Sequence, residues 1–397
     1  MIAAGGTGGH LYPAIAVARE LAELAPGTAV TFVGRAGGLE ERVVPREGFP
    51  FAAVECGPWR RGTPSSLLTG CLLAARGAFT ARRIIRTAGA SAVFSTGGFT
   101  SVPVLLAATA SRVPFVLHEP NQLPGVVTRV FGRFAQKVTV GYADAAGRFP
   151  SSRTLVTGVP VRRELMGRAT GEARAYLGVK EPACVVLALG GSKGAAAINR
   201  AMMEALPRLA SGGVQVSVIW ICGTGEEEAC RRKAESAPVP VRLFGYLDSI
   251  ADARGERSSR AIRSGSLGER SSRAIRSGSP VSMADALAAA DVVVMRAGAS
   301  SVAEVLALGK PSLLIPYPYA AEDHQTRNAE ALAREGAAML MPEKALTGAA
   351  LAAALSALAA DPGRRREMAR RAAALGRPGA AREVASLVLA AMGGAKC

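Results

Sequence analysis

The stretch 291–329 constrains the fold of this chain most, because short apolar runs alternate there with helical segments. The runs at 292–295 and 311–316 predict buried parallel strands, and each is followed by a small or polar turn that leads into a helix. Open α/β sheets bind ligands at the carboxyl ends of their strands. The stretch therefore predicts an α/β fold with a ligand site in the second half of the chain.

The helix expected to begin near Ser300 has the features of a nucleotide site. Its first backbone N–H groups and the positive end of its dipole suit a phosphate or a sugar hydroxyl. Glu304 follows about one turn later, where a carboxylate can accept two hydrogen bonds from a ribose diol. The same position is typical of a carboxylate that only complements the helix dipole. Both interpretations stand.

Length and composition favour a soluble two-domain enzyme over other classes. The 397 residues suffice for two domains of ordinary size, and 49% of them are hydrophobic. No apolar run reaches the roughly 18 residues of a membrane span, and no signal peptide precedes the first glycine loop. The six cysteines are scattered without a CxxC pair, which predicts reduced cytoplasmic thiols and neither disulfides nor a zinc site.

The formal charge of +17 predicts an anionic partner. Aromatic residues make up only 5% of the chain, and no nucleic-acid-binding motif occurs. We therefore expect a membrane surface or a phosphorylated substrate as the partner, and no nucleic acid.

Segment 59–87 mixes leucine, isoleucine and phenylalanine with six arginines. An apolar helical face flanked by arginines can lie on an anionic membrane. The same pattern is typical of a core-facing helix with a solvated basic rim, so the segment leaves both interpretations open.

Three glycine-rich loops follow expected strands, at 5–9, 96–101 and 190–195. The four glycines of the first loop let the backbone approach a ligand closely, and the helix behind it presents N–H donors to an anion. The pattern is neither GxGxxG nor a Walker motif. His10 ends the first loop, and Ser192 in the third would cap the following helix.

Domain boundaries follow from an extended segment beginning at Gly158. We expect a first domain over 1–157 and a second over 158–375, with a last helix at about 379–392 that crosses back to the first domain. The dodecamer at 255–266 recurs letter for letter at 268–279. We predict that 254–279 is a disordered insertion, because it is polar, repetitive and without an apolar face.

Six segments in order carry a resemblance over nearly the whole chain: GGTGGHLYPAIAVA, STGGFTSVP, HEPNQLPG, GVPVR, LGGSKGA and RAGASSVAE with DHQTRNA. Together they closely resemble the MurG family of peptidoglycan glycosyltransferases. The resemblance implies the GT-B architecture, in which two Rossmann-like α/β domains with parallel sheets face each other across a cleft.

The resemblance also implies an activity and a location. The expected reaction is inverting transfer of N-acetylglucosamine from UDP-N-acetylglucosamine to the 4-hydroxyl of muramyl-pentapeptide on undecaprenyl diphosphate, which turns lipid I into lipid II. The first domain would bind this lipid-linked muramyl-pentapeptide and the anionic inner membrane surface, and the second the UDP-sugar. Family members are peripheral proteins on the cytoplasmic face of the cell membrane.

Site residues are carried over where this sequence matches the family. In the first domain the resemblance implies donor-sugar contacts from Thr7, Gly8, Gly9 and Asn121. Arg162 and Ser192 would contact the donor diphosphate, and the acceptor diphosphate would lie against Gly97 and Gly98. In the second domain the implied donor contacts are Leu247 on uracil, Ala299, Ser300 and Ser301 in the nucleotide segment, Glu304 on the ribose, and Gln325 near the sugar hydroxyls, with His324 as the alternative.

Direct displacement at the anomeric carbon needs a general base for the acceptor hydroxyl. His10 is our candidate base, although a histidine that only caps the glycine loop would look the same. Glu119 is a weaker candidate. No Asp-x-Asp motif or metal-ligand cluster occurs, so we expect no metal cofactor, with UDP stabilised by a helix N-terminus and by Arg162.

Three departures from the family pattern bear on these expectations. Val159 stands where the family usually has asparagine, the first strand is short, and the duplicated insertion follows closely after Leu247. Two other functions remain open: a UDP-sugar epimerase of the same architecture, which would need no lipid acceptor, and a basic nucleic-acid-binding protein, whose affinity would depend on salt.

Overall fold

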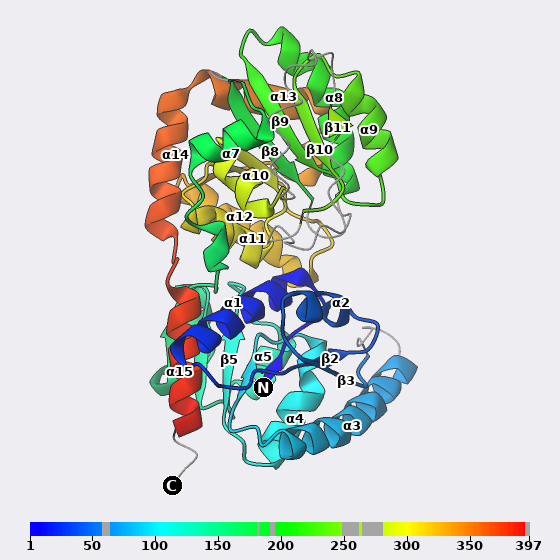
Figure 1. The fold of residues 1–397 in the computed structure, drawn as a ribbon, viewed down its shortest axis with the longest axis vertical. Coiled ribbons are helices and arrows are strands. Elements are labelled where there is room, and N and C mark those ends of the chain that lie inside the picture. The colour runs from blue at the N-terminus through cyan, green and yellow to red at the C-terminus, as the bar shows by residue number, and fades with distance from the viewer. Residues whose placement is uncertain (58–63, 181–182, 191–194, 248–261, 264–280, 394–397) are drawn as a thin grey trace. The chain divides into compact units, whose positions relative to one another are not determined.

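The computed structural model describes residues 1–57, 64–180, 183–190, 195–247, 262–263 and 281–393. The chain forms two compact units, one of Met1–Arg162 with Arg377–Cys397 and one of Arg163–Gly376 (Figure 1). Each unit is a parallel sheet covered on both faces by helices, as the alternation of apolar runs and helical segments predicts.

The first unit is built on a seven-stranded parallel sheet with the order β3-β2-β1-β4-β5-β6-β7. Because β4 lies on the other side of β1 from β2, the strand order reverses between β1 and β4. The strands are β1 Ile2–Ala3, β2 Phe32–Arg35, β3 Phe51–Val54, β4 Val93–Ser95, β5 Phe115–Glu119, β6 Lys137–Val140 and β7 Thr154–Val156.

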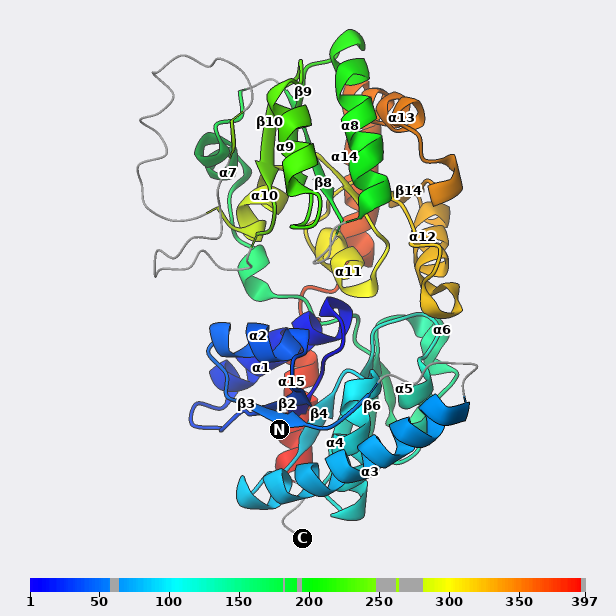
Figure 2. The same ribbon diagram turned by 90° about the vertical axis from the view of Figure 1, so that its right-hand side faces the viewer.

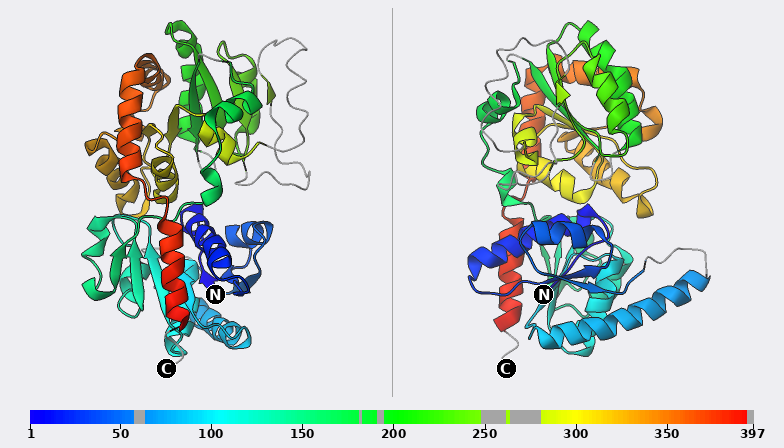
Figure 3. Two further views of the ribbon diagram at one scale, coloured as in Figure 1. Left: turned by 60° about the vertical axis from the view of Figure 1, so that its left-hand side comes forward. Right: turned by 45° about the vertical axis from the view of Figure 1, so that its right-hand side comes forward.

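Alternate residues of these strands point into two separate apolar cores. Phe94 packs with α1 Gly8–Leu24 and α15 Ala380–Gly393, which share one face of the sheet (Figure 3). Val93 packs on the other face with α3 Pro64–Thr87 and α4 Val102–Ala110, which run side by side (Figure 2). The remaining helices are α2 Leu39–Arg46, α5 Val126–Phe131 and α6 Ala143–Ala146.

The second unit repeats this plan with the strand order β11-β10-β9-β8-β12-β13-β14. Its order reverses between β8 and β12, and every neighbouring pair is parallel except β10 with β11. The strands are β8 Cys184–Leu189, β9 Val216–Ile221, β10 Val241–Phe244, β11 Ile262–Arg263, β12 Val292–Met295, β13 Ser312–Leu314 and β14 Ala338–Leu340.

Helices cover both faces of the second sheet. On one face lie α8 Ala196–Ser211, α9 Glu227–Glu235 and α13 Gly348–Ala360. On the other lie α7 Thr170–Leu177, α10 Met283–Ala289, α11 Ala299–Ala307 and α12 His324–Arg334. α14 Pro362–Leu375 contributes Met368 to the first core and Ala372 to the second.

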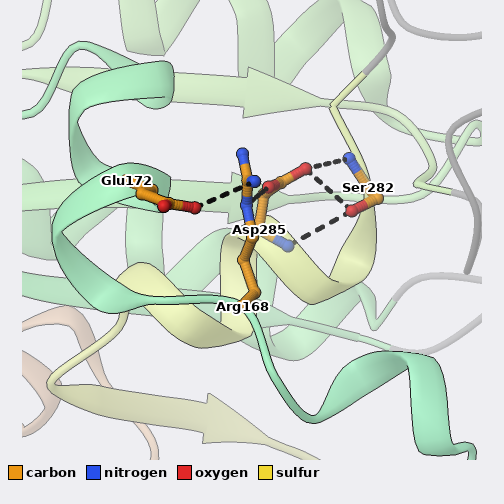
Figure 4. A network of polar contacts seen from close by, with 4 residues as sticks. All are labelled: Arg168, Glu172, Ser282 and Asp285. Carbon is orange, nitrogen blue, oxygen red and sulfur yellow. Dashed lines mark hydrogen bonds and ion pairs between the residues drawn. The ribbon is translucent and has the colours of Figure 1, made fainter.

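A polar network fixes the start of the second unit against α10. Ser282 and Asp285 form a reciprocal capping box at the N-terminus of α10. Arg168 donates from Nε to Asp285 Oδ1 at 2.7 Å and from Nη1 to Glu172 Oε2 at 3.3 Å (Figure 4). These contacts join two segments that are more than a hundred residues apart in the sequence.

The division between the units differs from the sequence-based boundary. The sequence predicts a boundary after residue 157, whereas segment 158–162 belongs to the first unit. Its backbone is held there, since Gly158 N donates to Val140 O at 3.2 Å. Val159 and Val161 are buried. The expected final helix at 379–392 is α15, which begins one residue later and belongs to the first unit.

Most of the expected insertion at 254–279 lies outside the described residues. The exception is Ile262–Arg263, which the structure describes as β11, antiparallel to β10. The prediction of disorder for the rest of the insertion stays a prediction.

Across the described part of the chain, every helix is too short or too polar to cross a membrane. The cysteines at 56, 184, 222 and 230 are buried thiols.

Candidate active site at the two strand-order reversals

In each unit, the predicted site residues gather where the strand order reverses. At such a point the loops after two neighbouring strands diverge to opposite faces of the sheet and leave a crevice between them, where α/β proteins bind ligands. In the first unit these are the loops after β1 and β4, and in the second those after β8 and β12. The predicted glycine loops 5–9 and 96–101 fall in these positions, whereas residues 191–194 of the third predicted loop lie outside the described residues.

His10 ties the loops after β1 and β4 together. Its Nδ1 lies 2.8 Å from the Thr96 carbonyl oxygen, and the Thr96 hydroxyl donates to the His10 carbonyl at 2.9 Å. Since a carbonyl can only accept, Nδ1 carries the hydrogen, and in a neutral ring Nε2 bears the lone pair. His10 Nε2 lies 3.7 Å from where a Cβ on Gly98 would stand. The hydrogen bond to Thr96 therefore fixes the tautomer and the orientation of the ring, and the role of His10 as a base stays a prediction.

The loop after β4 has a backbone that only glycine adopts readily. Gly97 and Gly98 both have φ of +81°. The Ser101 hydroxyl spans the loops, with acceptors at Gly97 O at 2.6 Å and Ala3 O at 3.0 Å. A side chain at Gly98 would press on Gly5 O at 3.3 Å. The two predicted acceptor-diphosphate residues therefore lie directly beside the first glycine loop.

The four glycines of the first loop serve different purposes, which corrects the interpretation that all of them admit a ligand. A Cβ at Gly5 would stand 2.4 Å from Glu40 Cδ, and one at Gly6 3.1 Å from the Phe99 ring. The space beside Gly5 and Gly6 is therefore filled by the side chains of Glu40 and Phe99 and not by a ligand. At Gly9 a Cβ would meet only Thr7 Oγ1, at 3.7 Å. Thr7, Gly8 and Gly9 form the start of α1, whose first N–H groups have no acceptor within the helix.

Glu119 is placed as a support, which argues against its predicted role as a base. Its carboxylate accepts from Asn121 N and Gly125 N, each at 2.9 Å, from Asn121 Nδ2 at 3.2 Å, and from the Thr128 hydroxyl. Only 1% of the residue is exposed. With its oxygens engaged, Glu119 positions the half-buried Asn121 at the end of β5.

His118 precedes Glu119 and is fully buried in β5. Its Nδ1 lies 2.9 Å from Thr139 Oγ1, while Nε2 has no hydrogen-bond partner. Burial, and to a lesser degree the nearby charge of His10, lowers the pKa of His118 from 6.5 to about 3. The side chain is therefore neutral at physiological pH.

In the second unit, α11 begins at the reversal point. Gly298 is its N-cap and no side-chain hydrogen bond caps it, so the N–H groups of the first turn have no acceptor within the helix. Ala299 and Ser300 are buried, while Ser301 and Glu304 are half-buried. Asn328 on α12 supports the turn, donating from Nδ2 to Ala297 O at 3.1 Å.

The loop before α12 brings the remaining predicted donor residues to the same edge. Gln325 Oε1 accepts from Tyr317 N at 3.0 Å. Glu322 and Asp323 have φ of +54° and +52°, an arrangement that costs free energy in non-glycine residues and is found at functional sites. His324 starts α12 directly after them.

For three predicted donor-binding residues, the structure describes no contact with the residues above. Ser192 lies outside the described residues. Leu247 is buried in the core of the second unit and is 3% exposed. Arg162 belongs to the first unit, where its guanidinium stacks 4.4 Å from the centroid of the Tyr12 ring. The donor roles of these three residues stay predictions.

The described residues hold no group of three or more His, Cys, Asp or Glu side chains with the proximity that a metal site needs. The sequence interpretation overlooked Glu40 and Tyr12, whereas Asn328 belongs to the DHQTRNA segment but was given no role. Glu40 and Tyr12 have no local signature, because each contacts a residue distant in the chain.

Comparison with known proteins agrees with this geometry. Residues 1–140 match the glycosyltransferase family 28 N-terminal domain, and residues 185–258 with 280–384 match the family 28 C-terminal domain. Two relatives are named UDP-N-acetylglucosamine–N-acetylmuramyl-(pentapeptide) pyrophosphoryl-undecaprenol N-acetylglucosamine transferase. The one from Desulforudis audaxviator is 36% identical, with 98% of this chain and 97% of the relative covered. The one from Moorella thermoacetica is 37% identical, with 98% of each covered.

Solved structures agree on the fold. MurG from Acinetobacter baumannii superposes with a TM-score of 0.70 at 26% identity, with 98% of each chain covered. A UDP-GlcNAc 2-epimerase from Neisseria meningitidis superposes with a TM-score of 0.60 at 13% identity, with 95% of each chain covered, which shows a shared fold alone.

Two Rossmann-like units, each with a ligand edge where its strand order reverses, define the GT-B class of glycosyltransferases. Within that class, the chain belongs to glycosyltransferase family 28.

Proposed function

We propose that this glycosyltransferase moves N-acetylglucosamine from UDP-N-acetylglucosamine to the muramyl-pentapeptide carried on undecaprenyl diphosphate, the lipid I to lipid II step of peptidoglycan synthesis. The observation that carries the proposal is similarity over 98% of the chain to transferases named for this reaction, at 36–37% identity. In support, the loops after β1 and β4 in the first unit are joined by hydrogen bonds and would bind the acceptor. The start of α11 in the second unit has no side-chain cap and would bind the donor.

The second unit binds the UDP moiety in this proposal. The uncapped start of α11 at Ala299, Ser300 and Ser301 offers backbone donors to an anion. Glu304, one turn further along the same helix, accepts from the ribose hydroxyls. Gln325 or His324 contacts the sugar.

The first unit binds the acceptor and supplies the base. The acceptor 4-hydroxyl gives its proton to His10 Nε2 as its oxygen bonds to the anomeric carbon from the face opposite UDP. The bond between that carbon and the phosphate oxygen breaks, UDP departs with the electron pair, and the anomeric centre is inverted. Holding both substrates in line contributes to the rate beyond the proton transfer.

We further propose that the reaction needs no metal. Helix N-termini and Arg162 would balance the charge of the departing UDP. A metal-dependent reaction would instead be inhibited by a chelator.

Membrane association is part of the proposal, with the anionic inner leaflet as the surface. One stripe of α3, with spacing of three or four residues, is exposed to solvent: Leu72, Arg76, Phe79, Arg83 and Arg86. Phe79 is 78% exposed and Leu72 60% exposed. Large apolar side chains beside arginines suit the boundary between acyl chains and anionic headgroups.

A UDP-sugar epimerase is the second candidate from the sequence. Epimerases with this fold are only 13% identical to the chain, whereas relatives above 30% identity bear the transferase name. The transferase is therefore the favoured function.

The deciding experiment incubates the protein with UDP-N-acetylglucosamine labelled in the sugar, with and without a lipid-linked muramyl-pentapeptide and with and without EDTA. We expect label in the lipid fraction, equal rates with EDTA, and no change in the UDP-sugar without acceptor. Acceptor-independent conversion of the UDP-sugar would establish the epimerase instead.

A further inference from the structure

A buried carboxylate stands behind the first glycine loop. Glu40 is the second residue of α2 and is 0% exposed. A carboxylate withdrawn from water must be hydrogen-bonded to be stable. Its partners are therefore informative, and among the described residues they are two backbone N–H groups.

These partners come from the ends of two neighbouring strands. Glu40 Oε1 accepts from Arg35 N, the last residue of β2, at 2.9 Å. Oε2 accepts from Gly6 N, after β1, at 3.2 Å, although the two residues are 34 positions apart. The single carboxylate thus fastens the loop that carries the proposed base to the adjacent strand end.

Three glycines form the space that Glu40 occupies. A Cβ at Gly5, Gly34 or Gly38 would stand 2.4, 2.6 or 2.7 Å from a carbon of the Glu40 side chain. At such distances a side chain at any of these positions would displace the Glu40 carboxylate. Gly5 follows β1, Gly34 lies in β2 and Gly38 lies in the loop after β2, so missing side chains on two neighbouring strands and their loops serve the same carboxylate.

The contact controls the backbone immediately before α1. Gly6 has φ of +81°, and Thr7, which follows it, is the N-cap of α1. His10 N and Leu11 N both donate to Thr7 O, at 3.2 and 3.1 Å. From the other side, Thr96 holds the His10 ring. Glu40 and Thr96 therefore fix the loop from its two flanks.

We propose that Glu40 is a positioning residue for the transfer reaction: by accepting the Gly6 N–H, it sets the start of α1 and so the place of His10 against the acceptor hydroxyl. The inference rests on the proposed function and deepens it. Glu40 itself touches no substrate. Its effect should appear in turnover and not in the affinity for UDP, because the nucleotide is held by the second unit.

The test compares Glu40→Gln with Glu41→Gln. Glu41 is the neighbouring carboxylate of α2 and accepts from Gly37 N at 2.5 Å, but it is exposed and does not reach Gly6. Glutamine at 40 keeps the size of the side chain, yet its amide nitrogen faces either Gly6 N–H or Arg35 N–H, donor against donor. We expect kcat to fall at least 10-fold in Glu40→Gln with the Kd for UDP within twofold, and both to stay within twofold in Glu41→Gln.

A second measurement is independent of activity. Hydrogen exchange of the backbone over residues 4–11 should be faster in Glu40→Gln than in wild type and unchanged in Glu41→Gln. Normal turnover in Glu40→Gln would overturn the inference, and so would unchanged hydrogen exchange over residues 4–11. Loss of both UDP affinity and the cooperative thermal unfolding transition in Glu40→Gln would also overturn it, because the variant would then be globally unfolded. A wild-type protein without lipid-dependent transfer would overturn the proposed function, and the exchange measurement would still decide the placement of the loop.

Discussion

His10 is the residue whose role the structure sharpens most. The bond from Nδ1–H to the Thr96 carbonyl is what orients a base, but it would also serve a histidine that only closes the loop. The two roles differ in what the ring must do during turnover.

Replacing His10 separates these roles. His10→Ala should lower kcat by about 10²–10⁴, the usual contribution of a general base, with UDP-N-acetylglucosamine affinity within about threefold. His10→Asn is the matched control, because its amide can still donate to the Thr96 carbonyl but cannot take a proton at neutral pH. Steady-state kinetics with calorimetric UDP binding measures both. Near-normal turnover in His10→Asn would show that the imidazole only closes the loop.

His118 predicts an acid sensitivity. Its folded pKa of about 3 lies below the ordinary 6.5, because burial excludes the charged form. Between these values the unfolded chain binds a proton that the folded protein does not, so stability is complete above pH 6.5 and falls as the pH drops toward 3, by about 1.4 kcal/mol per pH unit.

Asparagine at 118 removes this titration. Between pH 7 and pH 5, the unfolding free energy of the wild type should fall by about 2 kcal/mol more than that of His118→Asn. Urea denaturation at the two pH values measures the difference, and carboxylates that titrate in both proteins cancel. Equal losses in both proteins would contradict the buried, neutral assignment of His118.

At the scale of elements, α3 bears on both interpretations of segment 59–87. Its inner side packs Ala81 and Ile85 into the core of the first unit, which confirms the core-facing interpretation. Its outer stripe exposes Leu72 and Phe79 among arginines, and the membrane interpretation of that stripe stays a prediction.

Phe79→Ser tests whether the outer stripe binds a membrane. Burial of a phenylalanine side chain contributes about 1.5–3 kcal/mol. Phe79→Ser should therefore weaken binding to vesicles containing anionic lipid about 10-fold or more, as measured by sedimentation. Leu375→Ser is the control: Leu375 is 38% exposed on α14, where Arg370 and Arg371 pair with Glu367. Equal weakening in both variants, or none in Phe79→Ser, would refute a membrane role for α3.

At the scale of the whole molecule, the two units divide the substrates between them in the proposed function. UDP should then stabilise the second unit, by about 2.7 kcal/mol at a concentration of 100 times Kd. Hydrogen exchange should slow over residues 298–304 and 323–328 and not over 50–57 in the first unit. ADP, which has the diphosphate but not uracil, is the control and should act far more weakly. Equal protection by ADP, or protection absent from 298–304, would contradict the assignment of the nucleotide to α11.

The sequence by itself determined the local elements and the places of the loops. Apolar runs and glycines predicted β12, α11 and the glycine loops after β1 and β4, because strand burial, helix periodicity and helix termination depend on neighbouring residues. It also placed His10 and Glu304 beside those loops. The family motifs then supplied their proposed roles.

Only the tertiary structure decided which loops meet and which residues hold them. Strand order brings Thr96 to His10 across 86 positions and Glu40 to Gly6 across 34. It also assigned segment 158–162 to the first unit and turned Glu119 from a candidate base into the support of Asn121. The physical reason is that a buried carboxylate, or a glycine without space for a side chain, is defined by what packs against it. That neighbour comes from another part of the chain, where no local pattern reveals it.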